Sequence, residues 1–139
     1  MKQILLVMIG FSLLNAQLIR TGEIVYDSQT SLHWQDNRYA KSTRVAWLGA
    51  ISHCEALSLQ GFTDWRLPNK NELLSIVDYS VHDPSINDVF QNMTSYYYWS
   101  STTHAYYTGY AWSVYFYAGL SYYYSKTNTY GVRCVRGGQ

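Results

Sequence analysis

Two cysteines, Cys54 and Cys134, are the residues best suited to nucleophilic or redox chemistry. A catalytic thiol needs a nearby base to activate it, and no base is spaced for that role. In an exported protein, an even cysteine count indicates a disulfide first. Closing a loop of about 80 residues would stabilise the fold by about 4 to 5 kcal/mol in the chain-entropy model. We therefore expect a disulfide and no catalytic residue.

Metal ligands are present, but their spacing does not indicate a metal site. The chain has four histidines: His33, His53, His82 and His104. Their spacing is not that of a zinc site. Three aspartates and one asparagine share a segment and could offer oxygen atoms to calcium: Asp78, Asp83, Asn87 and Asp88. That spacing matches no calcium loop, and a solvated helix flank is the alternative. We expect no metal and no cofactor.

The tyrosine-rich segment from Tyr96 to Tyr130 is the main candidate for a binding function. It holds all fifteen tyrosines except Tyr26, Tyr39 and Tyr79, interleaved with Ser, Thr, Gly and Asn. Tyrosine offers a large, rigid contact area with a polar tip, and the small polar residues add adaptable hydrogen bonds, as in antibody paratopes. The alternative is an aromatic-rich sheet, because tyrosine also favours strands.

Alternation within residues 111–117 divides this segment into two faces. One face carries Trp112, Val114 and Phe116, which we expect to be buried. The other face, with Ser113, Tyr115 and Tyr117, should be exposed, and exposed aromatic patches usually mark contacts. We therefore predict one ligand-binding surface made of these residues: His104, Tyr106, Tyr107, Tyr110, Ser113, Tyr115, Tyr117, Tyr122, Tyr123, Tyr124, Asn128 and Tyr130.

The charge distribution argues against one class of partner. Without Lys2, nine basic residues balance nine acidic ones, whereas nucleic acid demands a basic face. No acidic residue follows Asp88, and Lys126, Arg133 and Arg136 give that part a local charge of +3. This excess favours an anionic ligand, or it is the lysine protection of a solvated sheet edge.

The first sixteen residues have the pattern of a secretory signal peptide. Lys2 precedes an apolar run over residues 4–14, and Leu14-Asn15-Ala16 is a small-residue cleavage site. The apolar run is too short to span a membrane. Residues 17–139 have the size of one domain. We expect a protein that is secreted, periplasmic or on the cell surface, with no membrane span.

The elements expected to position these residues begin with a hairpin of strands over 24–26 and 32–34. Apolar residues at helical spacing then predict a helix over about 45–59, with Cys54 on its buried stripe and Gly61 ending it.

A second, short helix follows a capping box, with Asn69 as the N-cap and Glu72 at the third position. Arg66 is expected to pair with Glu72. Residues 80–94 are expected to form a loop with a helical turn at 85–90. The remaining segments are expected to form one terminal sheet of four strands, with a hairpin turn at residues 118–120: 97–102, 111–117, 122–125 and 131–136.

Several sequence blocks resemble the Lcl C-terminal domain family of collagen-like bacterial adhesins: LHWQD at 32–36, GFTDWRLP at 61–68, EL at 72–73, YWSST at 98–102, AW at 111–112 and VRCVR at 132–136. The resemblance implies an α+β fold of the C-type-lectin-like kind, with two helices, a twisted antiparallel sheet, adjacent terminal strands and a helix-to-last-strand disulfide. Its scaffold would include Trp65, Arg66, Trp99, Trp112 and Phe116. It also implies adhesion or ligand binding rather than catalysis.

A second resemblance concerns the tyrosine-rich segment. Domains of this fold serve as targets of diversity-generating retroelements, which vary solvent-facing positions among Tyr, Ser, Thr, Asn, His, Asp, Ala and Gly. The predicted ligand-binding residues, together with Thr108, look like such positions.

We therefore expect an exported adhesion module that presents this surface to a protein or a glycan. The alternative is a structural subunit of a cell-envelope assembly. An enzyme ranks third, because the sulfatase-modifying oxidases of related fold need free cysteines. A homo-oligomer is left open.

Overall fold

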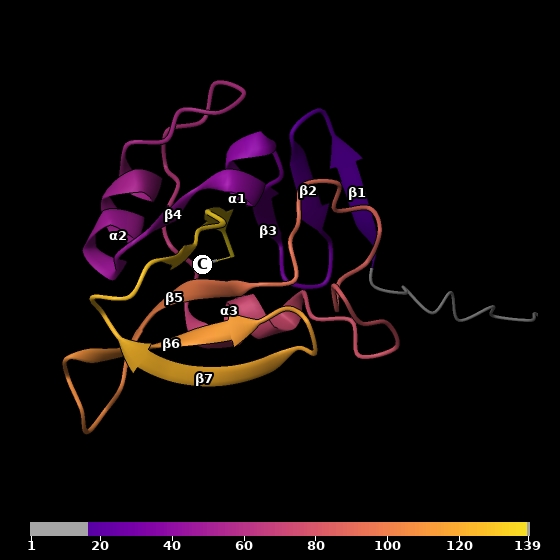
Figure 1. Cartoon of the computed structure of the whole chain (residues 1–139). Helices are drawn as coiled ribbons and strands as arrows, with labels where there is room; N and C mark the ends of the chain where they lie inside the picture. The colour runs from indigo at the N-terminus through magenta and orange to yellow at the C-terminus, as the bar shows by residue number, and fades with distance from the viewer. Residues whose placement is uncertain (1–16, 139) are drawn as a thin grey trace, which may run out of the picture.

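One antiparallel sheet, sheet A, is built from segments far apart in the chain. The computed structural model describes residues 17–138. Strands β1 (Leu18–Thr21), β2 (Ile24–Asp27) and β3 (Leu32–Gln35) form a meander, and β9 (Val135–Gly137) pairs with β3. The predicted hairpin is therefore confirmed, and so is the proximity of the terminal strands (Figure 1). The predicted signal peptide lies outside the described residues.

Sheet B contains the tyrosine-rich segment. Its order is β4 (Arg44–Val45), β8 (Tyr130–Gly131), β5 (Tyr97–Thr103), β6 (Tyr110–Tyr115) and β7 (Leu120–Ser125). The β5–β8 pair is parallel and the other pairs are antiparallel. The predicted β6–β7 turn is present but spans residues 116–119, and Leu120 belongs to β7. Gly119 adopts φ +74° in this turn, a conformation that L side chains rarely adopt.

The prediction of a single last strand in the terminal sheet is wrong. The segment expected to form one strand over 131–136 divides, so that β8 joins sheet B and β9 joins sheet A. Between the two strands, Arg133 is buried against Asp36, Gln35 and Asn92. These polar contacts take the place of ladder pairing at that point.

The described part of the chain, residues 17–138, contains three short helices. The capping box opens α3 (Lys70–Ser75) as predicted. Helix α2 (Trp47–Glu55) is shorter than its predicted range at both ends, because Val45 belongs to β4 and the helix ends with Ala56 as its C-cap. The prediction that Gly61 ends this helix is therefore wrong. Helix α1 (Arg38–Ser42) was not predicted; Asn37 caps it by accepting the Tyr39 and Ala40 N–H groups.

Residues 80–94 form the expected loop, and the helical turn predicted at 85–90 is reduced to a single turn at 87–90, where the Phe90 N–H donates to the Asn87 carbonyl at 3.1 Å. Ile86, within the predicted turn, instead pairs with Val77 in an isolated bridge. None of the helices within residues 17–138 has the length and apolar character needed to cross a membrane.

Sheet B is covered on both faces. One apolar cluster joins α2 to the sheet through Ala50, Cys54, Trp99 and Ala111. The other joins α3 and sheet A to the opposite face, and includes Leu73, Trp34, Tyr98, Val114 and Phe116. An alternating strand in this sheet therefore has no face that is exposed along its whole length.

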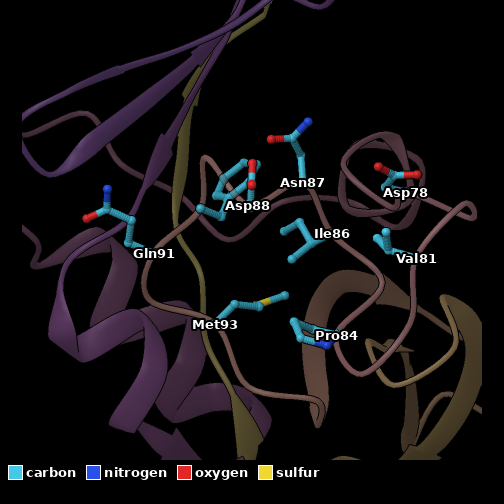
Figure 2. Close-up of a pocket in the computed structure, with 9 residues that line it drawn as sticks. Asp78, Val81, Pro84, Ile86, Asn87, Asp88, Gln91 and Met93 are labelled. Atoms are coloured by element: carbon cyan, nitrogen blue, oxygen red, sulfur yellow. The ribbon is translucent and has the colours of Figure 1, made fainter.

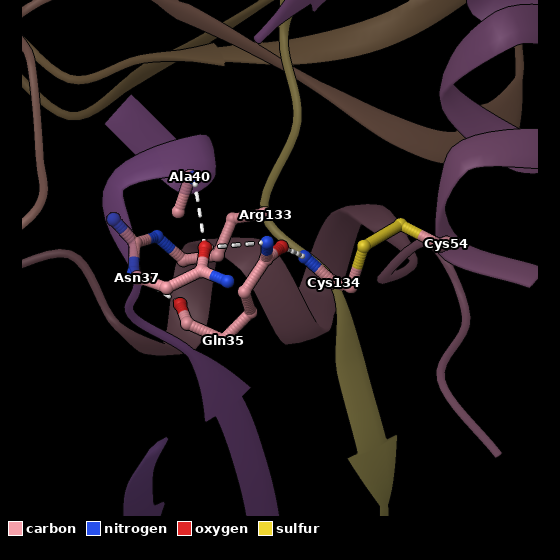
Figure 3. Close-up of a disulfide and its surroundings, with 6 residues drawn as sticks. All are labelled: Gln35, Asn37, Ala40, Cys54, Arg133 and Cys134. Carbon is pink, nitrogen blue, oxygen red and sulfur yellow. Dashed lines mark hydrogen bonds between the residues drawn. A yellow bond between two sulfur atoms is a disulfide. The ribbon is translucent and has the colours of Figure 1, made fainter. Parts of the chain in front are cut away.

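The predicted disulfide links Cys54 on α2 to Cys134, with the two Cα atoms 5.4 Å apart. Figure 3 shows the hydrogen bonds that connect Cys134 to Gln35 and Gln35 to Asn37. The Cys134 N–H donates to Gln35 Oε1 at 3.0 Å, and Gln35 Nε2 donates to Asn37 Oδ1 at 2.9 Å. The bond thus joins α2 to the segment between the two sheets, which in turn contacts the cap of α1.

Candidate ligand-binding surface

The tyrosines predicted to form one surface lie on both faces of the β6–β7 hairpin. In the register, Trp112 lies opposite Tyr123, whereas Ser113 lies opposite Tyr122. Residues directly opposite each other in an antiparallel pair point to the same face. Tyr123 therefore shares the face that packs on α3, and Tyr122 and Tyr124 share the face that packs on α2.

The face toward α2 carries the packed tyrosine cluster: Tyr96, Tyr97, Tyr115, Tyr117, Tyr122, Tyr124 and Tyr130. Tyr97 is its centre. Its ring stacks on Tyr115 with the ring centres 4.3 Å apart and meets Tyr124 edge-on at 5.2 Å. The hydrogen bond with the Tyr124 hydroxyl, followed by burial, raises the pKa of Tyr97 above its ordinary value.

The opposite face, at the far end of the hairpin, carries the exposed tyrosine cluster: His104, Tyr106, Tyr107, Tyr110, Trp112 and Tyr123. All four tyrosines of this cluster are exposed, with exposed fractions of 82% for Tyr106, 52% for Tyr107, 41% for Tyr110 and 43% for Tyr123. No core cluster backs these rings, so this face is free to contact a ligand.

His104 organises the loop that presents this cluster. Its Nδ1 accepts the N–H groups of Tyr106 at 3.2 Å and Tyr107 at 3.0 Å, so Nδ1 carries no hydrogen. Its ring lies 5.3 Å from Tyr107 and 4.3 Å from Tyr123. The backbone closes the loop where the His104 N–H donates to the Tyr110 carbonyl at 2.9 Å. The loop is thus held by hydrogen bonds while its rings remain exposed.

Trp112 lies at the base of the exposed tyrosine cluster, half-exposed, and the prediction that it is buried is wrong. The apolar core under α3 includes Val114 and Phe116 but not Trp112. Instead, Lys70 Nζ, from the first residue of α3, lies 3.7 Å from the centre of the Trp112 ring. His104 stacks on it at 5.5 Å. The cluster therefore joins aromatic surface to one cation.

The structure separates the predicted ligand-binding residues by exposure. Exposed are Tyr106, Tyr107, Tyr110, Tyr117, Tyr122 and Tyr123; half-buried are His104, Tyr115, Tyr124 and Asn128; buried are Ser113 and Tyr130.

The prediction that Ser113 and Tyr130 are exposed is wrong. Ser113 lies in register between Trp99 and Tyr122, and its Oγ donates to the Tyr122 carbonyl at 3.2 Å. Tyr130 packs on Trp99, with ring centres 4.7 Å apart.

The other predicted scaffold residues lie where expected. Trp65, Trp99 and Phe116 are buried. Arg66 donates to both carboxylate oxygens of Glu72 at 2.7 Å, so the predicted pair is bidentate. Burial raises the pKa of Glu72, but the hydrogen bonds from Arg66 and the Asn69 N–H outweigh it, and the pKa is lowered.

The three cations that follow Asp88 in the sequence do not form a free positive surface for an anionic ligand. Arg133 is buried against Asp36. Arg136 Nε donates to an Asp64 oxygen at 2.6 Å. The third cation, Lys126, lies 3.9 Å from the centre of the Trp47 ring and donates to Thr103. All three therefore have partners within the domain.

A hollow of about 590 Å³ lies away from both tyrosine clusters, on the loop after α3. Its walls are largely apolar: Met93 and Pro84 lie on one side of Ile86, and the carboxylates of Asp78 and Asp88 on the other (Figure 2). Among residues 17–138, no three His, Cys, Asp or Glu side chains gather as a metal site requires.

The chain matches a known protein family. The family model described as "Lcl C-terminal domain" matches residues 23–136, a range that includes both tyrosine clusters and the disulfide. No curated protein matches the chain.

Proposed function

The chain belongs to the Lcl C-terminal domain family, and we propose that it is an adhesin-like module that binds a protein or a glycan through the exposed tyrosine cluster. One observation carries the proposal. Tyr106, Tyr107, Tyr110 and Tyr123 remain exposed side by side, although the core of the domain does not use them. Exposed aromatic patches of this kind are typical of contact sites.

The chemistry of the cluster suits recognition. Tyrosine and tryptophan rings are the residue types most often found at the energetic centres of interfaces. Each ring offers an apolar face for a sugar ring or an apolar side chain, and each hydroxyl offers one hydrogen-bond donor. Lys70, over Trp112, adds one positive charge at the base of the cluster. A ligand with an acidic group beside an apolar surface would match this arrangement.

We also propose a location for the protein and a pattern of variability for its surface. A disulfide is typical of proteins outside the reducing cytoplasm, and we infer that the domain is secreted, periplasmic or on the cell surface. If the segment is diversified, variation should occur at exposed positions such as Tyr106, Thr108 and Tyr123, and not at Ser113 or Tyr130. Sequencing the same locus in sister isolates tests this. A constant surface would favour the structural-subunit alternative.

An alanine scan read in two ways tests the binding surface. Tyr107→Ala and Tyr123→Ala should change the free energy of unfolding by about 0.5 kcal/mol or less, as at most surface positions. At an anchoring position, each should weaken binding on a glycan array or in a cell-surface binding assay by about 2 kcal/mol, roughly 30-fold.

Tyr39→Ala is the matched control, because Tyr39 is equally exposed but lies on α1, away from the hairpin. The proposal fails if Tyr107→Ala and Tyr123→Ala bind as tightly as the Tyr39→Ala control.

A further inference from the structure

Strand β7 is an open sheet edge without the usual protection. It runs for six residues, pairs only with β6, and forms the outer strand of sheet B (Figure 1). Its sequence, LSYYYS, has no charge and no proline, and its pairing with β6 has no bulge. Natural proteins usually protect such edges with lysine, proline, bulges or covering segments, because an unpaired edge is a template for another strand.

The other sheet edges of the domain are protected. Strand β1 has four residues and carries Arg20, and β4 has only two residues, one of them Arg44. The outer side of β9 is covered, because Arg66 and Val135 exchange two backbone hydrogen bonds of 2.9 Å. Among the described strands, β7 alone combines length, neutrality and an uncovered edge.

The hydrogen-bonding groups of this edge can be assigned from the ladder. Just beyond the strand, the Lys126 N–H donates to the Gly109 carbonyl at 2.9 Å, so Lys126 faces β6. Because the direction alternates along a strand, Tyr122 and Tyr124 also direct their N–H and C=O groups toward β6. Ser121 and Tyr123 direct theirs outward. The Ser125 carbonyl already accepts from the Asn128 N–H at 3.0 Å.

We propose that β7 pairs antiparallel with β7 of a second copy of this chain, about a two-fold axis that passes beside Tyr122. In this register Ser121 of each copy lies opposite Tyr123 of the other, so the four outward groups of each edge are matched. Ser125, whose carbonyl is occupied, lies outside the paired region. A neutral edge meets its own copy without repulsion between like charges.

The space beside the edge is compatible with this pairing. A hollow of about 450 Å³ is lined by Trp112 and by residues 121–124 of β7, with rings from both faces of the strand. A two-fold axis perpendicular to the sheet keeps each face on its own side. The dimer would therefore present two exposed tyrosine clusters on one side of a continuous sheet, an arrangement that allows bivalent binding.

A cysteine at the axis tests the pairing directly. Tyr122 would lie opposite its counterpart in a non-hydrogen-bonded pair, where Cα atoms are about 4.5 Å apart and a disulfide can form. Tyr122→Cys should give at least roughly tenfold more disulfide-linked dimer than Tyr106→Cys, because only the former places its thiol within bonding distance of its counterpart. Tyr106 is the control, since it is more exposed and lies off the edge. Equal crosslinking of the two variants would overturn the proposal.

A second pair of variants tests whether the backbone makes the contact. Tyr123→Pro removes an outward N–H without breaking the ladder to β6, so sedimentation should show loss of the dimer with little change in melting temperature. Tyr123→Ala keeps that N–H and should keep the dimer. A wild-type chain that remains monomeric at its solubility limit, or a Tyr123→Ala variant as monomeric as Tyr123→Pro, would contradict strand pairing. Both readouts are independent of ligand binding, and so of the proposed function.

Discussion

Replacing Asp36 by alanine should remove much of the stability of the domain, because the buried Arg133 would lose its counter-charge. Both side chains are fully buried, and Arg133 Nη1 lies 3.0 Å from Asp36 Oδ1. The same carboxylate accepts the N–H groups of Gln91 at 2.8 Å and Asn92 at 3.0 Å. It also pairs with Arg20. One side chain thus joins the end of β3 to the loop before β5 and to the segment before β9.

The expected loss in the free energy of unfolding can be worked out from these contacts. Removing one partner of a buried ion pair typically costs about 3 to 5 kcal/mol. Each backbone N–H left unpaired in a dry site adds about 1 to 3 kcal/mol. We therefore expect Asp36→Ala to lower the free energy of unfolding by at least about 5 kcal/mol, a large share of the roughly 5 to 15 kcal/mol that stabilises a domain. At about 4 °C per kcal/mol for this size, the melting temperature should fall by at least about 20 °C.

Urea unfolding and thermal melting of the oxidised protein measure the effect, with Asp64→Ala as the matched control. Asp64 also pairs with an arginine, Arg136, at 2.6 Å, but its side chain is 62% exposed. Solvent screens an exposed ion pair, so losing it should change the free energy of unfolding only slightly. If Asp36→Ala and Asp64→Ala lowered the free energy of unfolding equally, by a small or by a large amount, burial of the ion pair would not be the cause of the stabilisation, and the reasoning would be refuted.

Two further predictions concern the disulfide and the packed tyrosine cluster. The double variant Cys54→Ser, Cys134→Ser should lose about 4 to 5 kcal/mol in urea unfolding; an unchanged midpoint would contradict this. Burial raises the pKa of Tyr130, and the bond to Tyr124 and then burial raise that of Tyr97. Because the folded state holds these protons more tightly, their stabilisation is complete below about pH 10 and lost as the pH rises above it. Phenolate absorbance should therefore show late-titrating tyrosines whose ionisation coincides with loss of circular dichroism; native dichroism after all tyrosines had ionised would refute this.

Local signals in the sequence were enough to predict several elements. The Asn69–Glu72 capping box, the β2–β3 hairpin and the β6–β7 turn each depend on residues close together in the chain. The alternation over residues 111–117 also placed Val114 and Phe116 correctly in the core.

The exposure of the tyrosines could not be predicted in the same way. Alternation indicates which residues share a face, but not what covers that face. Helix α2 and its cluster cover the side of Ser113, whereas the core under α3 does not reach Trp112. Both outcomes depend on how elements distant in sequence pack together.

The division of the VRCVR block into two strands was missed for a related reason. Alternating apolar residues around Arg133 indicate one strand with its arginines outward. The residue that accepts Arg133 in the interior is Asp36, 97 positions away. A buried arginine therefore has no local signature, and only the pairing of the two distant blocks identifies it.

The pairing of β3 with β9 has a consequence for the chain during its synthesis. The ribosome must add nearly 100 residues after Gln35 before Arg133 and Cys134 exist to contact it. Until then, the N-terminal hairpin has an apolar face with nothing to bury it, and contacts of such long range form slowly. We therefore expect the nascent chain to remain accessible to holding chaperones, and in an unfolded state, throughout nearly all of translation.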